Sequence, residues 1–111
     1  MSAGTPPADP AAMIVLETTV GSEADADALT AALLERRVAA CVQRSAVRST
    51  YRWEGEITTE DEILLRCKAP AAARDRLCAA IDELHPYETP EVVLVAAEAG
   101  DRYGAWLHEN V

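Results

Sequence analysis

The feature that most constrains the fold of this chain is a long extended stretch that doubles back on itself. Residues 39–53 contain no Pro or Gly and are rich in Val, Thr, Ser, Tyr and Trp, which predicts a long strand. Glu54-Gly55 then offers a tight reversal, and residues 57–68 predict a second, antiparallel strand. Both strands exceed the usual length of about 5–6 residues. A hairpin this long extends beyond one small core and predicts a partner chain.

Charge is distributed unevenly along this hairpin. Residues 36–53 carry five arginines and no acid, whereas residues 54–62 carry five acids. If the turn holds two residues, Arg48 lies opposite Asp61, so the favoured interpretation is that neighbouring strands neutralise each other. A basic groove for an anionic ligand is the alternative. Neither strand alternates cleanly between apolar and polar residues, which leaves room for a bulge. The arginines are Arg36, Arg37, Arg44, Arg48 and Arg52.

Further strands and helices are predicted on both sides of the hairpin. Alternation or continuous apolar character indicates the strands, and apolar residues at helical spacing indicate the helices. The predicted elements are a strand at 13–20, a helix at 23–37 capped by Ser22, a helix that begins at Pro70 and ends before His85-Pro86, a strand at 92–97 and a helix at 101–109. This βαββαβ order with a C-terminal helix predicts an α+β, ferredoxin-like fold, in which both main helices cover one face of an antiparallel sheet.

The length of 111 residues predicts one domain. Residues 1–12 contain three prolines and no apolar period, so they are expected to be a disordered tail, and residues 13–111 to form the domain. Phe is absent and aromatic residues make up 5% of the chain, which predicts an aliphatic core. Such a small core is marginal alone, and burial between subunits would supplement it.

Charge and cysteine content exclude several classes of protein. The net charge of −9 argues against binding to the phosphate backbone of nucleic acids and favours cationic partners. No run approaches the roughly 18 apolar residues of a membrane span, and no secretory leader is visible at the N-terminus. Three cysteines, Cys41, Cys67 and Cys78, cannot all pair within the chain. These features predict a cytoplasmic protein that binds neither membranes nor nucleic acids.

The sequence contains few candidate catalytic residues. The five glycines are scattered singly, so there is no phosphate loop, and neither a GxSxG turn nor a Ser/His/Asp arrangement is recognisable. Cys41 is the only plausible thiol nucleophile. It begins a strand rather than a helix, and the start of a helix is the position at which thiols are commonly activated, so a buried structural thiol is the favoured interpretation. We therefore expect that the protein is not an enzyme.

Soft metal ligands are available but follow no strict spacing. Thiolate and imidazole ligands suit copper better than magnesium or calcium. His85 closes a predicted helix, where a cation or hydrogen bond at the helix end is the favoured structural alternative, and Pro86 prevents His85 and Glu88 from lining one helical face. His108 is interpreted as solvated. The candidate ligands are Cys41, Cys67, Cys78, His85, Glu88 and His108.

Two large aromatic side chains lie just before the hairpin turn. Because alternate residues of a strand share a face, Tyr51 and Trp53 are expected side by side. A hairpin tip is normally exposed, and Tyr and Trp are enriched in interface cores, so we predict that both residues are buried against another subunit. A stacking platform for a nucleic-acid base is the alternative, which the net charge disfavours.

Three blocks of this sequence resemble the signature motifs of CutA, the divalent-cation tolerance family. They are Arg-Val-Ala-Ala-Cys-Val at 37–42, Tyr-Arg-Trp-Glu-Gly at 51–55 and His-Pro-Tyr-Glu-Thr-Pro-Glu at 85–91, and the resemblance extends over about residues 13–107. Tyr103 and Trp106 resemble the aromatic positions of the family's last helix. The resemblance implies a homotrimer, similar in architecture to PII-type signalling proteins, in which the long hairpins extend the sheets of neighbouring subunits.

The resemblance also implies a function and residues for it. A role in binding copper or another divalent metal ion transfers to Cys41 and to the third block, where His85 and Glu88 are the predicted ligands; Cys67 and Cys78 lie outside the matched positions. The first expected function is a metal-binding or metal-responsive trimer with sites between subunits. The alternative is a PII-like signalling or scaffold trimer whose clefts bind a small anion or a partner protein.

Overall fold

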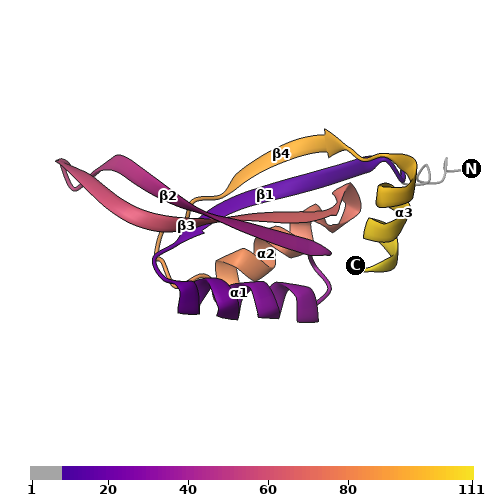
Figure 1. Ribbon diagram of the computed structural model, residues 1–111, viewed down its shortest axis with the longest axis horizontal. Coiled ribbons are helices and arrows are strands. Elements are labelled where there is room, and N and C mark those ends of the chain that lie inside the picture. Colours follow the sequence, from indigo (N-terminus) through magenta and orange to yellow (C-terminus); the bar gives the residue numbers. More distant parts are fainter. Residues whose placement is uncertain (1–8) are drawn as a thin grey trace, which may run out of the picture.

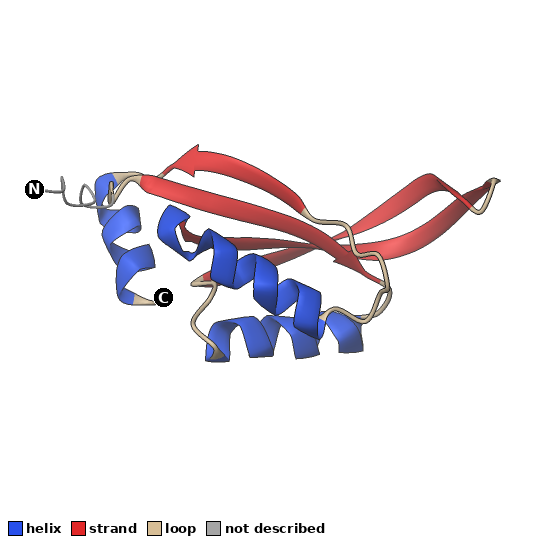
Figure 2. Cartoon of the chain, turned by 180° about the vertical axis from the view of Figure 1, so that it is seen from behind, coloured by secondary structure: helices blue, strands red, loops and turns tan. Residues whose placement is uncertain are grey.

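A four-stranded antiparallel sheet with strand order β2-β3-β1-β4 forms the centre of the molecule. The computed structural model describes residues 9–111. Helices α1 and α2 cover one face of the sheet, and α3 packs at one end (Figures 1 and 2). The predicted α+β, ferredoxin-like fold is confirmed. The elements are β1 (Ala12–Val20), α1 (Glu23–Glu35), β2 (Cys41–Trp53), β3 (Glu56–Pro70), η1 (Ala71–Ala73), α2 (Arg74–Leu84), β4 (Val93–Glu98) and α3 (Asp101–Glu109).

The main core lies between the sheet and the two helices α1 and α2. Alternate residues of β1 face this layer, and Leu and Ile side chains at helical spacing meet them from α1 and α2. A second, smaller cluster lies on the opposite face of β1, where α3 covers it. Its buried members are Met13, Val15, Ala99 and Leu107. Both clusters are aliphatic, as the absence of Phe predicted.

Strands β2 and β3 form one continuous hairpin. Their register runs without interruption from Cys41 opposite Lys68 to Trp53 opposite Glu56, so the predicted two-residue turn is confirmed and the suggested bulge was wrong. Both turn residues have positive φ, 49° at Glu54 and 81° at Gly55. Two such residues make a type I′ turn, whose twist matches that of the paired strands and keeps them in register.

The hairpin projects beyond the helical layer (Figure 1). The molecule measures 56 × 28 × 24 Å, and its radius of gyration is 15.7 Å. A compact chain of this length would have a radius of gyration of about 13 Å. Nearly all side chains in the outer half of the hairpin are exposed, including Ile57. The described residues therefore bury side chains only in the inner half of the β2–β3 hairpin.

Several boundaries differ from the predicted ones. Helix α1 ends at Glu35 because Arg37 adopts a left-handed conformation, with φ of 55°, and the N–H of Val38 returns to the carbonyl of Leu33 at 3.2 Å. Pro70 ends β3 rather than beginning a helix. Most of the expected tail, residues 1–8, lies outside the described residues. Among residues 9–111, no helix combines the length and apolar character needed to cross a membrane.

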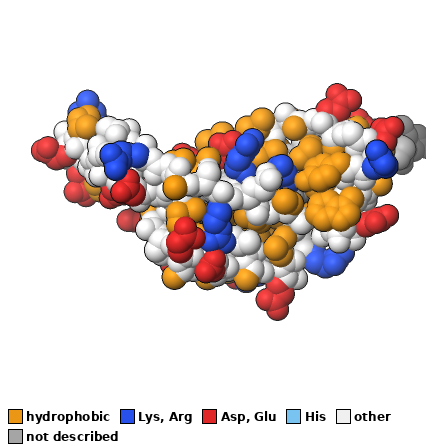
Figure 3. Space-filling model, in the orientation of Figure 1, with side chains coloured by type: hydrophobic (Ala, Val, Ile, Leu, Met, Phe, Trp, Pro, Cys, Tyr) orange, Lys and Arg blue, Asp and Glu red, His pale blue; other side chains and the backbone are white. Residues whose placement is uncertain are grey.

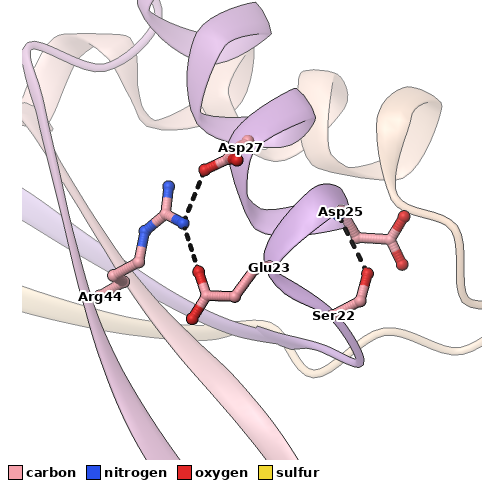
Figure 4. A network of polar contacts seen from close by, with 5 residues as sticks. All are labelled: Ser22, Glu23, Asp25, Asp27 and Arg44. Atoms are coloured by element: carbon pink, nitrogen blue, oxygen red, sulfur yellow. Dashed lines mark hydrogen bonds and ion pairs between the residues drawn. The ribbon is translucent and has the colours of Figure 1, made fainter.

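The arginines are neutralised mainly by the helices rather than by the neighbouring strand. Figure 4 shows the guanidinium of Arg44, on β2, donating from Nη1 to Glu23 and Asp27 of α1, each at 2.8 Å. Arg36 pairs with Glu83 of α2. Among the described residues, Arg48 and Asp61 form the one ion pair that joins β2 to β3, at 3.0 Å. The expectation that the two strands neutralise each other holds for that pair alone.

Candidate functional site

An open cleft of about 1210 Å³ lies between the hairpin and the turn that connects α2 to β4. In Figure 3 the outline of the molecule is hollowed between the projecting hairpin and the body. We call it the hairpin cleft; its lining comes from the end of β1, from β2 within residues 49–53, from β3 within residues 58–62 and from residues 87–91. Two of the three sequence blocks therefore meet at one surface.

His85 holds the turn of the hairpin cleft in place. Its side chain is 8% exposed, and Nε2 lies 2.9 Å from the carbonyl oxygen of Thr19, the last residue but one of β1. Nδ1 accepts the backbone N–H of Tyr87 at 3.0 Å, so the hydrogen must sit on Nε2 and be donated to Thr19. Burial lowers the pKa of His85, although the bond to Thr19 acts in the opposite direction. His85 is thus neutral, and both ring nitrogens are engaged.

Tyr87 connects this turn to β3. Its hydroxyl donates to Oε2 of Glu62 at 3.1 Å, and its ring lies 4.9 Å from that of His85. Burial, followed by the bond to Glu62, raises the pKa of Tyr87 to about 12. A Cβ atom on Gly21 would lie 3.0 Å from the Tyr87 hydroxyl, so a larger residue there would displace the hydroxyl by a few tenths of an ångström. Glu62 is itself 8% exposed, which makes it a buried carboxylate in the wall of the cleft.

The hairpin cleft is strongly acidic. Of the described residues that line it, none is Lys or Arg. Asp61 is paired with Arg48, but the other four carboxylates form no ion pair within residues 9–111. Burial, together with the nearby charges of Glu17 and Glu62, raises the pKa of Glu91. The field in the cleft therefore favours cations over anions. The five acidic residues are Glu60, Asp61, Glu62, Glu88 and Glu91.

The predicted metal ligands do not converge within one chain. Glu88 is exposed and follows His85 by three residues, but Cys41 lies at the start of β2, two strands away from β1. Cys41 pairs with Lys68 of β3, which in turn pairs with Val15 of β1. His85 contacts Thr19, four residues further along β1. The two predicted ligands are therefore separated by about 13 Å along the strand direction. Within residues 9–111, no three His, Cys, Asp or Glu side chains are grouped closely enough to hold a metal ion. A metal-binding role for Cys41, His85 and Glu88 stays a prediction.

The remaining candidate ligands occupy separate places. Cys67 is fully buried in the core, and burial raises the pKa of its thiol to about 12. Cys78 is half-buried on α2, and all three thiols are free. His108 was predicted to be solvated, and this was wrong for one ring nitrogen. Its Nε2 is buried and has no hydrogen-bond partner among the described residues.

Sequence reasoning missed Glu62 and Tyr87 as a pair. Glu62 was grouped with the acids that face the arginines, and Tyr87 was only part of a motif. The strand alternation contains the missing information, since Glu62 shares a face with Glu60 and lies opposite Val47 on the side of Tyr51. Its neighbour Tyr87 could not be inferred, because the two residues are 25 positions apart and meet only in the fold.

Known proteins are similar to this chain in both sequence and fold. Residues 14–110 match the family described as "CutA1 divalent ion tolerance protein". The chain belongs to this CutA1 family. It is 41% identical over 98 residues to the divalent-cation tolerance protein CutA of Thermus thermophilus, covering 86% of this chain and 95% of that protein. These matches confirm the family resemblance of the three sequence blocks.

Solved CutA structures superpose closely on this CutA1 chain. CutA from Synechococcus elongatus has a TM-score of 0.86 and 33% identity, with 90% of each chain covered. A protein from Archaeoglobus fulgidus, described as a periplasmic divalent cation tolerance protein CutA, has a TM-score of 0.84 and 25% identity over 88% of this chain and 97% of its own. These CutA proteins therefore share the fold of this chain.

Proposed function

We propose that this chain is a non-enzymatic divalent-cation tolerance protein that acts as a homotrimer and binds copper, or another divalent metal ion, between its copies. The observation that supports this most is the separation of the predicted ligands: Cys41 and the His85–Glu88 turn lie about 13 Å apart along the strand direction, on different strands of the sheet. No group of three ligands exists in the described part of one chain. A metal site that includes both Cys41 and His85 would therefore combine side chains from different copies.

Exposed apolar surface supports the proposed trimer. Tyr51 is 37% and Trp53 is 52% exposed, and both project from the part of the hairpin that has no core beneath it. Val93 and Val95, on the uncovered face of β4, are exposed as well. Burial of these side chains against neighbouring copies removes apolar surface from water and stabilises the assembly. Tyr51 and Trp53 are accordingly the proposed interface residues.

The proposed ligands differ in how ready they are to bind. Cys41 is half-buried at the start of β2, and Glu88 is exposed. His85 becomes a ligand only if Nδ1 releases the N–H of Tyr87, which opens the turn. Thiolate and imidazole together favour copper over hard cations. Metal binding would then be coupled both to assembly and to the conformation of the turn.

Copper titration under anaerobic conditions tests this proposal. We expect Cys41→Ser and His85→Ala to lose affinity, because the proposed site uses both residues. Cys78→Ser is a matched control, since Cys78 is a half-buried free thiol on α2, outside the proposed site. If Cys41→Ser and His85→Ala bind copper as the wild type does, the two residues are structural and the metal-site proposal fails.

A second candidate function is a PII-like signalling or scaffold trimer that binds its ligand or partner in a cleft. The hairpin cleft favours this candidate, because it is open and is lined by two of the family's sequence blocks. Its acidic lining indicates a cationic group on the ligand rather than the small anion suggested by the sequence. We place either function in the cytoplasm, whose reducing conditions suit three free thiols.

A further inference from the structure

We propose that the hydrogen bond between Tyr87 and Glu62 is a brace at a hinge of the hairpin. We call residues 47–62 the outer arm. The brace fixes the angle at which the outer arm leaves the body, and it thereby prepares the arm to dock on a neighbouring copy. The brace itself is a property of one chain, whereas its effect on docking rests on the proposed trimer.

The outer arm begins where its support by the rest of the sheet ends. Strand β1 pairs with β3 as far as Val20 opposite Ile63, so residues 47–53 and 56–62 pair only with each other. Figure 1 shows this two-stranded part projecting beyond the helices. Two strands alone are marginally stable in water and twist more than a wider sheet does. The hairpin therefore bends most easily at the junction next to Ile63.

Glu62 lies directly at this junction and ties the outer arm to the body. It is the one buried side chain of the arm, at 8% exposed, and it accepts the Tyr87 hydroxyl at 3.1 Å. Among the described residues, this is the one side-chain hydrogen bond between the arm and the rest of the chain. The others, such as that between Thr50 and Thr59 at 3.0 Å, lie within the arm. Because the acceptor is a buried carboxylate, the bond is of the stronger, charge-assisted kind.

The body holds the other end of the brace in a defined position. Tyr87 follows His85, whose ring nitrogens lie 2.9 Å from the carbonyl oxygen of Thr19 and 3.0 Å from the backbone nitrogen of Tyr87. The Tyr87 hydroxyl also packs against Gly21, where a Cβ atom would be 3.0 Å away. The end of β1 and the residue after it therefore set the position of Tyr87, and through it that of Glu62.

Charge opposes the braced position of the arm. Glu91 lies on the same turn as Tyr87, close enough to Glu62 for the two carboxylates to repel each other. Of the described residues that line the hairpin cleft, none is Lys or Arg, which would offset this repulsion. The hydrogen bond therefore holds the arm against a force that separates it from the turn, and the arm has two alternatives, braced and released.

A small rotation at the hinge displaces the proposed interface residues. Trp53 lies six residues beyond Val47, which is about 20 Å along the strand. A rotation of about 10° at the junction thus moves the tip of the arm by roughly 3 Å. Interface cores are packed as closely as protein interiors, so such a displacement would misplace Tyr51 and Trp53. An arm that is restrained beforehand also loses less conformational freedom on docking.

Hydrogen exchange of the full-length protein in its native oligomeric state tests the brace. We expect Tyr87→Phe to speed amide exchange in residues 47–62 roughly tenfold or more, while β1 and α1 exchange as in the wild type. A role in overall stability alone would speed exchange throughout the chain. Thr50→Val is the matched control, because it removes a hydroxyl hydrogen bond that lies within the arm, and valine is equally suited to a strand. Its exchange should match that of the wild type.

Assembly measurements test the effect on docking. Light scattering over a range of concentrations should show that Tyr87→Phe needs a several-fold higher concentration to assemble. Subunit exchange between labelled copies should show that the assembled variant dissociates at the rate of the wild type, because the brace acts before docking. Faster dissociation of the variant would contradict the proposal, since Tyr87 would then act in the interface itself.

The brace is disproved if Tyr87→Phe leaves exchange in the outer arm unchanged, if it speeds exchange equally in β1 and α1, or if Thr50→Val has the same effect. Should Tyr87→Phe not fold, Gly21→Ala replaces it and must loosen the arm, because its Cβ displaces the Tyr87 hydroxyl and φ at Gly21 is not positive. A wild type that is monomeric at every concentration would contradict the proposed trimer, while hydrogen exchange would still decide whether the brace exists.

Discussion

His85 shows how the same residue type can serve either of two purposes. A histidine at a helix end beside a Glu suggested either a metal ligand or a capping group. In the structure it forms hydrogen bonds to the backbones of Thr19 and Tyr87, so it joins β1 to the turn that follows α2. Those bonds hold only for the neutral ring with hydrogen on Nε2. The residue therefore makes the conformation of the hairpin cleft sensitive to protonation.

The first prediction concerns stability against pH. Burial lowers the pKa of His85 below its usual value of 6.5, so on acidification the unfolded chain binds a proton before the native protein does. The contribution of His85 to the free energy of unfolding should therefore be constant above this value and fall as the pH drops below it, through the window down to the native pKa. Urea unfolding between about pH 5 and pH 8 measures this dependence.

Two variants assign the pH effect to one residue. His85→Gln should remove this contribution to the pH dependence, and His108→Gln, which changes the only other histidine, should retain it. An unchanged dependence in His85→Gln would show that the buried ring does not control stability in this range.

The second prediction concerns the pair formed by Tyr87 and Glu62. Tyr87→Phe removes the hydroxyl that donates to a buried carboxylate. We expect the free energy of unfolding to fall by about 1–3 kcal/mol, the usual cost of leaving a buried polar group without its partner. Denaturant unfolding gives the value. In the Glu62→Gln background the same change should cost less, because the acceptor is no longer charged; additive effects of the two changes would contradict a direct interaction.

Among the elements, α3 is held by close contact with the N-terminal segment. A Cβ atom on Gly104 would lie only 2.5 Å from the backbone carbonyl oxygen of Pro10. The helix therefore packs this closely against the N-terminal segment because residue 104 is a glycine. Arg37 donates to the carbonyl of Glu109, which is near the end of the same helix, at 2.9 Å. The C-terminal helix is thus attached at both of its ends.

The third prediction follows from that contact. In an open helix, Gly→Ala would stabilise by about 1 kcal/mol. Gly104→Ala should instead lower the melting temperature, because the added Cβ meets backbone that cannot rotate away. Gly100→Ala is the matched control: Gly100 precedes the same helix, its Cβ would meet nothing within 4 Å, and we expect little change. A higher melting temperature for Gly104→Ala would mean that the N-terminal segment moves easily.

The hairpin is the element that the sequence described best. Its two-residue turn, the pairing of Arg48 with Asp61 and its length all follow from local signals. The partners of Arg36 and Arg44 do not, because they lie on α2 and α1. Opposite charges that are near in sequence are not always the nearest in space, since helices packed against the sheet compete for the same arginines.

At the scale of the whole molecule, two of the surfaces on which large apolar side chains are exposed are the hairpin and α3, where the largest apolar patch in Figure 3 lies. Val93 and Val95 of β4 and Leu34 of α1 are exposed as well. Tyr103 and Trp106 of α3 stack with ring centroids 5.6 Å apart, and Tyr103 is 39% and Trp106 is 41% exposed. A single copy leaves both surfaces in water, whereas the proposed trimer provides partners for them.

The fourth prediction tests that assembly. Light scattering at micromolar concentration should give the mass of a trimer. Trp53→Ala should shift the protein toward smaller species, with a loss of about 2 kcal/mol or more, as for central aromatic residues of an interface. Leu34→Ala is a suitable control, because Leu34 is 41% exposed on α1, on the helical side of the molecule. A monomeric wild type, or a Trp53→Ala variant with unchanged mass, would contradict the proposed interface.

The sequence alone determined the secondary-structure elements, the hairpin register and the family of this protein. Apolar periodicity indicated the strands and helices, the Glu54-Gly55 turn set the hairpin register, and three blocks at the right spacing indicated the family. The hairpin cleft needed the fold, because His85 meets Thr19 across 66 positions and Tyr87 meets Glu62 across 25. Such contacts depend on strand order and on how the turn after α2 packs against β1, to which no short sequence window is sensitive. For the same reason only the folded chain showed that Cys41 and His85 lie apart.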